Sequence, residues 1–123
     1  MGNDSEDVLY EILLDTSLDD DVYRALSSTP RRYTLYTLLE WDRISLDELA
    51  DVLTGWLYAS EYRMATAEDR EQLLAELRRQ HIRMLRKSGL VDYDPREELL
   101  VRSEFSPSVV RLLHWALAHE YEN

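Results

Sequence analysis

The sequence predicts a mainly α-helical domain with one small β-hairpin. Apolar residues repeat at spacings of three and four along most of the chain, as they do in helices that bury one face. Residues that cap helices precede several of these segments, and after Gly89 the pattern changes to short extended runs separated by a turn. A chain of 123 residues suffices for one compact domain with a modest core, and two full domains would not fit.

The first 21 residues are predicted to form an acidic helical arm. They contain eight acids and no base, yet Val8, Leu9, Ile12 and Leu13 follow helical spacing. We therefore expect residues 1–21 to include a short amphipathic helix that buries its apolar face against another surface.

The following segment predicts a longer helix and then a very short strand. Thr29 can cap a helix that has Pro30 at its first position and extends to about Trp41. The core-facing stripe of this helix consists of Leu35, Leu38 and Leu39. Ile44 fits a minimal strand after it.

Capping residues predict where two more helices begin. Ser45 and Glu48 have the spacing of a capping box, which predicts that a second helix begins there. Thr66 caps a third helix expected over residues 67–88, and Gly89 follows at the left-handed position that glycine tolerates best.

Beyond Gly89 the chain predicts a hairpin and a last helix. Residues 90–93 and 99–102 have the composition of strands, and residues 94–97 form the turn between them. Pro107 then opens a helix with one apolar stripe.

The order of these elements is that of a winged helix-turn-helix domain with additional N- and C-terminal helices. We assign residues 22–104 to the winged helix DNA-binding domain and residues 105–123 to a C-terminal dimerisation helix. The connection over residues 54–65 is longer than the turn of about three or four residues in a compact motif. It could extend either neighbouring helix or bring Trp56 and Tyr58 into a dimer contact.

A basic segment near the end of the third helix is the main functional signal. Five cations lie within ten residues that contain no acid, and helical projection separates most of them from the apolar residues. Arginine can contact guanine, glutamine can contact adenine, and both can contact the DNA backbone. The predicted DNA-binding residues are Gln72, Arg78, Arg79, Gln80, Arg83, Arg86, Lys87 and, at the hairpin tip, Arg96. The alternative is that the cations only solvate an exposed helix face and complement the helix dipole.

Three segments, LSSTPRR, ISLDELADVL and LRKSGLVDYD, give the chain a family resemblance. It resembles small winged-helix transcriptional regulators of haloarchaea, PadR-like in layout, over about residues 26–120. The resemblance implies a sequence-specific transcriptional regulator that acts as a homodimer. A winged-helix protein-interaction module that does not bind DNA is the alternative.

The composition agrees with a halophilic source. The formal net charge is −11, and the cations are thirteen Arg and one Lys. GC-rich codon usage together with an acidic solubilising surface is an alternative explanation. The N-terminus lacks the pattern of a signal peptide, and no apolar run is long enough to cross a bilayer, so we expect a cytoplasmic protein in high salt.

The expected partners are double-stranded DNA with a pseudopalindromic operator, a second copy of the chain and bound salt ions. Dimeric helix-turn-helix proteins place two recognition helices about one DNA turn apart. The predicted dimer interface comprises Leu9, Ile12, Leu13, Val109, Leu112, Leu113, Ala116 and Leu117.

Other chemistry has little support in the sequence. There is no cysteine, no phosphate-binding glycine loop and no nucleophile motif, so we expect no enzyme, no metal site and no cofactor. His81 lies on the apolar side of the third helix and fits a buried, hydrogen-bonded histidine. Tyr33, Tyr36 and Trp41 could line a small-molecule pocket, although a core or interface stripe is the more common role for such a pattern.

Overall fold

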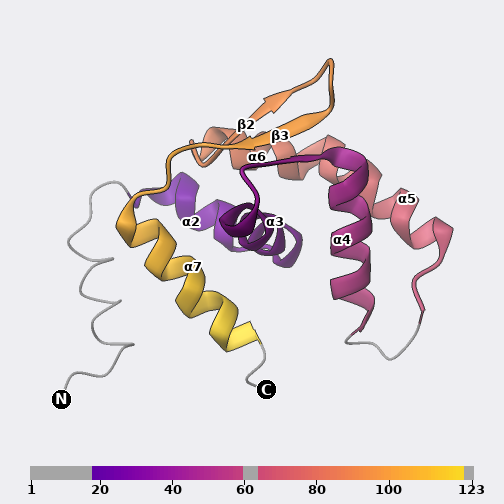
Figure 1. Ribbon diagram of the computed structural model, residues 1–123, viewed down its shortest axis with the longest axis horizontal. Coiled ribbons are helices and arrows are strands. Elements are labelled where there is room, and N and C mark those ends of the chain that lie inside the picture. Colours follow the sequence, from indigo (N-terminus) through magenta and orange to yellow (C-terminus); the bar gives the residue numbers. More distant parts are fainter. Residues whose placement is uncertain (1–17, 60–63, 121–123) are drawn as a thin grey trace.

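The computed structural model describes residues 18–59 and 64–120 and confirms a mainly helical winged-helix layout with a small antiparallel sheet (Figure 1). The helices and strands follow one another in the order predicted from the sequence. The elements are α2 (Asp20–Leu26), α3 (Thr29–Glu40), β1 (Arg43–Ser45), α4 (Leu46–Ala59), α5 (Ala67–Glu76), the π-helical segment η1 (Leu77–His81), α6 (Ile82–Lys87), β2 (Val91–Asp94), β3 (Leu99–Arg102) and α7 (Pro107–Glu120).

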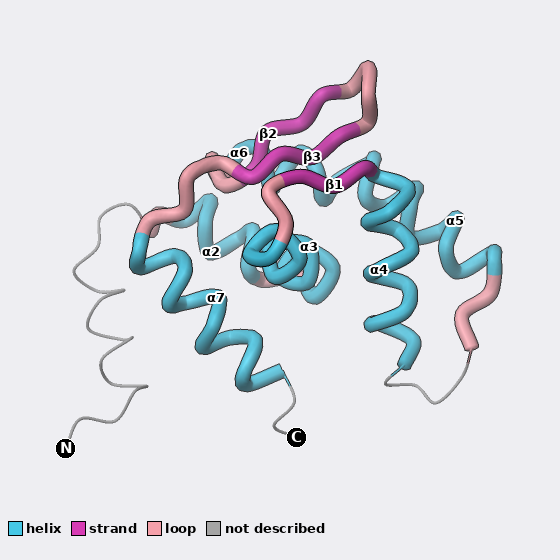
Figure 2. Tube along the Cα trace, viewed as in Figure 1, coloured by secondary structure: helices cyan, strands magenta, loops and turns pink. Residues whose placement is uncertain are grey.

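The sheet has three strands in the order β1-β3-β2, and both pairings are antiparallel. Leu100 in the central strand pairs with Ile44 on one side and with Tyr93 on the other. The short strand expected at Ile44 therefore adds an edge to the predicted hairpin. The sheet lies along one side of the helices (Figure 2).

Capping residues explain where most helices begin. The Ser45 hydroxyl accepts a hydrogen bond from the Glu48 N–H at 3.1 Å, and Thr66 and Asp69 form a complete capping box at α5. The prediction for α3 is wrong by one residue, because Ser28 is the N-cap and its side chain makes no capping hydrogen bond. Pro30 stabilises this start, since its fixed φ suits the first helical turn.

The first half of the connection over residues 54–65 lengthens α4. That helix continues through Gly55 to Ala59, and residues 60–63 are outside the described part of the chain. The extra turns of α4 therefore account for about half of the predicted insertion.

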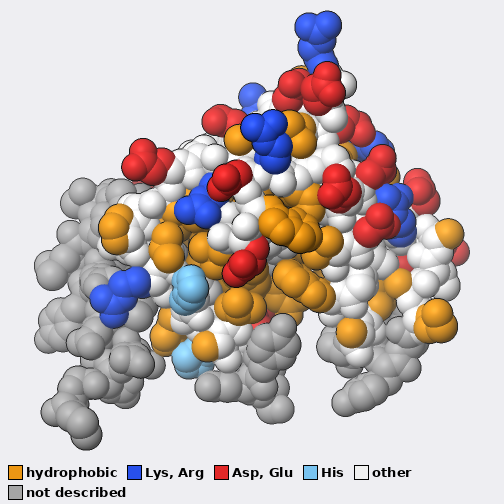
Figure 3. Space-filling model, viewed as in Figure 1, with side chains coloured by type: hydrophobic (Ala, Val, Ile, Leu, Met, Phe, Trp, Pro, Cys, Tyr) orange, Lys and Arg blue, Asp and Glu red, His pale blue; other side chains and the backbone are white. Residues whose placement is uncertain are grey.

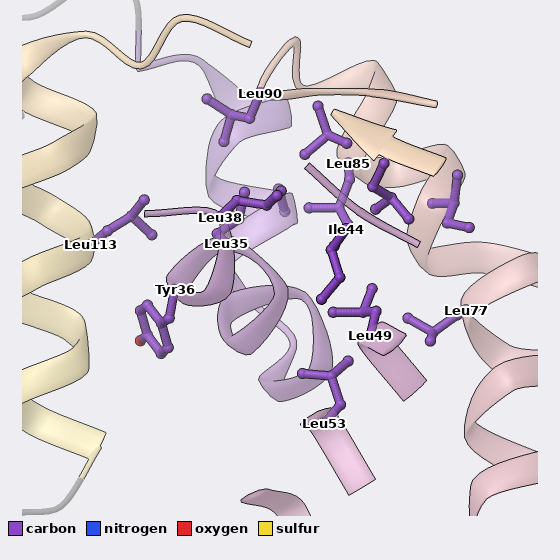
Figure 4. Close-up of a cluster of buried hydrophobic side chains, with 14 of the residues drawn as sticks. Leu35, Tyr36, Leu38, Ile44, Leu49, Leu53, Leu77, Leu85, Leu90 and Leu113 are labelled. Atoms are coloured by element: carbon purple, nitrogen blue, oxygen red, sulfur yellow. The ribbon is translucent and has the colours of Figure 1, made fainter. Parts of the chain in front are cut away.

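Helices from both ends of the domain share one core. Leu35 and Leu38 of α3, Leu49 and Leu53 of α4, Leu77 of η1, Leu85 of α6 and Leu113 of α7 are all buried in one cluster (Figure 4). Leu18 and Val22 at the N-terminal side belong to the same cluster. One core therefore joins the described residues of the predicted winged helix to the C-terminal helix, and the division of the chain into an arm, a winged helix and a C-terminal dimerisation helix stays a prediction.

The predicted dimer stripe on α7 is largely used within the chain. Val109, Leu112 and Leu113 are buried, and Ala116 and Leu117 are partly buried against the core, because α7 packs directly on α3. Val109, Leu112 and Leu113 are therefore buried within the chain itself, whereas Ala116 and Leu117 keep part of their surface, and the dimer interface stays a prediction. The other predicted interface residues, Leu9, Ile12 and Leu13, lie outside the described residues.

Candidate nucleic-acid interface

The predicted third helix is one continuous helix made of α5, η1 and α6, which we call the recognition helix. It contains a π turn in which the Ile82 N–H donates to the Leu77 carbonyl, five residues earlier. Because a π turn adds one residue, α6 is rotated by about 100° relative to an uninterrupted α-helix. Ile82 is therefore buried, whereas Met84, which a regular α-helix would place on the same face as Leu77, is only half-buried.

A buried arginine holds the centre of the recognition helix. Arg31 of α3 is 6% exposed, and its Nη1 donates to Nδ1 of His81 at 2.9 Å. Its other nitrogens donate to the carbonyl oxygens of Ala25 at 3.2 Å and Arg24 at 2.9 Å. The guanidinium thus connects α2, α3 and the π turn. Because it is buried, Arg31 is not available for contact with a phosphate of DNA.

His81 is a neutral hydrogen-bond acceptor in this arrangement. It is 4% exposed, which agrees with the prediction of a buried, satisfied histidine. Burial, together with the positive charges of Arg31 and Arg79, lowers the pKa of His81 to about 4. The histidine therefore accepts from Arg31 throughout the neutral pH range.

The opposite face of the recognition helix is exposed and basic. Arg79, Arg83 and Arg86 are exposed, and within residues 18–59 and 64–120 their side chains form no hydrogen bond or ion pair. Gln72 and Gln80 are exposed on the same helix. The structure therefore leaves the amides and these three guanidinium groups accessible to a ligand.

Two of the five cations have carboxylate partners. Arg78 forms a bidentate ion pair with Glu98, with N–O distances of 3.1 Å, and Lys87 lies 3.9 Å from Asp21. Both pairs are solvent-exposed, so an anionic ligand could replace the carboxylate at little cost. Arg32 pairs with Glu120 of α7 at 2.9 Å and takes no part in this surface.

A groove between α6 and β2 gathers the cations of the last turns. It has a volume of about 510 Å³ and is open to solvent. Four of its lining residues are basic, and Tyr93 of β2 forms part of its wall, a position that the sequence analysis missed because it assigned Tyr93 only to a strand. The complete lining is Arg78, Ile82, Arg83, Arg86, Lys87, Asp92 and Tyr93.

The first half of the recognition helix has the opposite charge. α5 contains four acids and one base, Arg70, whereas η1 and α6 contain five Arg or Lys and no acid. Arg70 is held by α4, where Nε lies 2.7 Å from an Asp51 oxygen and Nη2 lies 3.4 Å from an Asp47 oxygen. The anion-binding potential is therefore confined to the C-terminal half.

The hairpin is also mainly acidic. Arg96 lies in the exposed turn between β2 and β3, and its backbone N–H donates to Asp94 at 2.9 Å. Four carboxylates surround this single cation in the sequence, at Asp92, Asp94, Glu97 and Glu98. Figure 3 accordingly shows acidic side chains beneath the basic tip of the hairpin. Such a hairpin repels a phosphate backbone except at its tip.

A family model for a domain of unknown function, DUF7344, matches residues 23–101. The chain belongs to this family. The DUF7344 match begins within α2 and ends within β3, so it contains the whole recognition helix and excludes α7. No curated protein and no solved structure matches the chain significantly.

Two other kinds of site are absent from the described part of the chain. None of its helices there is long and apolar enough to cross a membrane. Residues 18–59 and 64–120 also contain no group of three or more His, Asp or Glu side chains that could hold a metal ion.

Proposed function

We propose that this protein is a DNA-binding transcriptional regulator that uses the C-terminal half of its recognition helix. The observation that carries the proposal is the solvent-open groove beside α6, in which four basic side chains converge. Cations gathered on one helix face are the electrostatic requirement for binding a phosphate backbone. The winged-helix order of the elements supports the same function, because this fold presents its third helix to the major groove.

The exposed side chains suggest a division of roles. Arg79 and Arg83 are four residues apart on the exposed face and are free to contact base edges. Arg86 and Lys87, in the last turn, suit phosphate contacts. Arg78 would exchange Glu98 for a phosphate on binding. Gln72 and Gln80 flank this strip and supply amide groups for adenine.

The acidic first half of the helix determines how it would approach DNA. Many helix-turn-helix proteins contact bases with the N-terminal residues of the recognition helix. Here that end bears a net negative charge, and its Arg70 is engaged by Asp47 and Asp51. The C-terminal half would therefore enter the groove, with the acidic end directed away from the phosphates.

High salt makes this acidic protein compatible with DNA. At about 1 M salt the Debye length is roughly 3 Å, so remote carboxylates are screened while direct arginine contacts persist. The same salt reduces the gain from counterion release, so binding would depend on direct base contacts, with salt ions between protein carboxylates and phosphates. The proposed unit is a cytoplasmic homodimer on a pseudopalindromic site, since one helix contacts only one half-site.

The test measures binding of the full chain to a pool of genomic duplex fragments by fluorescence anisotropy across a KCl series. We expect Arg79→Ala combined with Arg83→Ala to weaken binding at least about tenfold, because each good arginine–guanine contact contributes about 1–3 kcal/mol. The control removes the same charge elsewhere, at Arg43 of β1 and Arg111 of α7, and should retain most of the affinity. Equal losses in the two double variants would mean that only net charge matters.

A second candidate function is a winged-helix module that binds a protein. The acidic hairpin favours it, because this surface suits a basic protein partner better than DNA. Absence of binding to any duplex from low to molar KCl, by a chain whose circular dichroism confirms folding, would make this candidate the better one.

A further inference from the structure

The space between α3 and α4 contains a hollow that the DNA-binding proposal does not use. It has a volume of about 100 Å³ and is formed by the end of α3 and one face of α4. Its lining residues are Tyr36, Thr37, Glu40, Trp41, Val52 and Trp56. None of them lines the groove beside α6. The hollow is therefore a separate feature of the surface.

Two tryptophans remain open to solvent at this hollow. Trp41 is 50% exposed and Trp56 is 43% exposed, although burial of such large side chains would normally be favourable. Trp56 is exposed although it has a neighbour, since its ring packs edge-on against Tyr33 with 5.5 Å between the ring centroids. Tyr33 in turn packs against Tyr36 at 5.5 Å. Trp56, Tyr33 and Tyr36 are thus packed against one another, while Trp56 and Trp41 keep exposed surface.

One residue among those that line the hollow carries a formal charge. The Thr37 hydroxyl donates to the Tyr33 carbonyl at 2.8 Å, so its hydrogen is already used. Burial raises the pKa of Tyr36 to about 12, so this side chain is neutral at physiological pH. Glu40 is exposed and forms no hydrogen bond or ion pair with the described residues. The wall of the hollow is therefore almost wholly apolar and largely aromatic, with Glu40 as its one charged lining residue.

We propose that this hollow binds the head group of a small organic cation, a quaternary or alkylated ammonium. Aromatic faces, tryptophan above all, attract cations, and Glu40 adds a formal negative charge. Alkyl groups on the nitrogen bury favourably against the indoles, whereas a strongly hydrated K⁺ or Na⁺ would lose its water shell without enough oxygen ligands. A volume of about 100 Å³ admits one such head group and is too small for a peptide segment.

Charge separates this ligand class from the other small molecules. An anion would approach the Glu40 carboxylate in a chain of net charge −11. A neutral apolar molecule would match the apolar wall but would gain nothing from Glu40 or from the cation–π attraction. An alkylated ammonium gains from the rings and from the charge of Glu40, and a comparison with a neutral ligand of the same shape tests this difference.

Side-chain NMR of the full chain tests this proposal without DNA. The protein has three tryptophans, and each gives one indole N–H signal. Titration with choline at constant ionic strength should shift the signals of Trp41 and Trp56 and leave that of Trp115, which lies on α7 beside His119, unchanged. Equal shifts of all three signals, or no shift, would refute the site.

Two comparisons decide whether charge recognition is involved. The neutral isostere 3,3-dimethyl-1-butanol should bind about tenfold more weakly than choline, because it lacks the cation–π attraction. Glu40→Gln should weaken choline binding about threefold to tenfold, whereas Glu104→Gln, the same change at another exposed carboxylate, should not. Equal affinity for choline and its isostere, or equal effects of the two variants, would overturn the proposal.

Discussion

Acid should destabilise this protein through one histidine in particular. His81 accepts a hydrogen bond from the buried Arg31 guanidinium, so a proton on the ring would place two positive charges 2.9 Å apart. An unfolded chain protonates histidine near pH 6.5, whereas the folded protein holds the pKa of His81 at about 4. The lowered pKa means that stability is complete above pH 6.5 and falls as the pH decreases toward 4.

The size of this effect follows from the difference between the two pKa values. A shift of one pKa unit corresponds to about 1.4 kcal/mol, so the histidine alone should remove about 2 kcal/mol by pH 5 and about 3 kcal/mol by pH 4. Such a loss is a large part of the 5–15 kcal/mol that stabilises an ordinary domain.

Chemical denaturation of wild type and His81→Gln at several pH values provides the assay. Glutamine can still accept a hydrogen bond from Arg31 through its amide oxygen, but it does not titrate. The carboxylates titrate in both proteins, so the difference between the two unfolding free energies contains only the contribution of His81. The difference in unfolding free energy should change by about 2 kcal/mol between pH 7 and pH 5. His114→Gln, at an exposed histidine, is the control and should run parallel to wild type. Parallel curves for wild type and His81→Gln would refute this account of the buried pair.

Three further substitutions have expected outcomes. Gly89→Ala should lower the unfolding free energy by about 1 kcal/mol in a thermal melt, because Gly89 has φ +80 and no atom crowds its Cβ position; an unchanged melt would exclude backbone strain. Leu113→Ala should cost about 3 kcal/mol in chemical denaturation, since Leu113 is fully buried; a variant of unchanged stability and lower mass in solution would instead support the dimer stripe. Glu98→Gln should change stability by less than about 1 kcal/mol and strengthen DNA binding in the anisotropy assay, because it releases Arg78; weaker binding would contradict the proposed role of Arg78.

The element order was predictable because its signals are local. The Ser45 and Thr66 caps, Pro30 and Gly89 each act within a few residues, and the structure confirms the helix starts or ends that they indicate to within one residue. The buried role of His81 was also predictable, since it follows from the position of the residue on an apolar helix face.

The failures concern contacts between distant segments. Nothing near Arg31 in sequence indicates that its guanidinium is buried against a histidine fifty residues later. The α7 stripe was assigned to a partner because periodicity identifies an apolar face but not the surface that covers it. The π turn was not predicted either, because helical projection assumes a constant rotation per residue. The one added residue places Ile82, instead of Met84, in the core.

The recognition helix is fixed to its neighbours at two places. Its acidic first half is fixed to α4 through Arg70, and its π turn is fixed to α3 through Arg31 and His81. The rotation that this turn adds buries Ile82 in place of Met84. Arg79 and Arg83 are four residues apart, so they would share one face in an uninterrupted α-helix as well. The π turn therefore determines which apolar residue of α6 enters the core, while the exposed side of the same segment keeps both arginines on which the proposed base contacts depend.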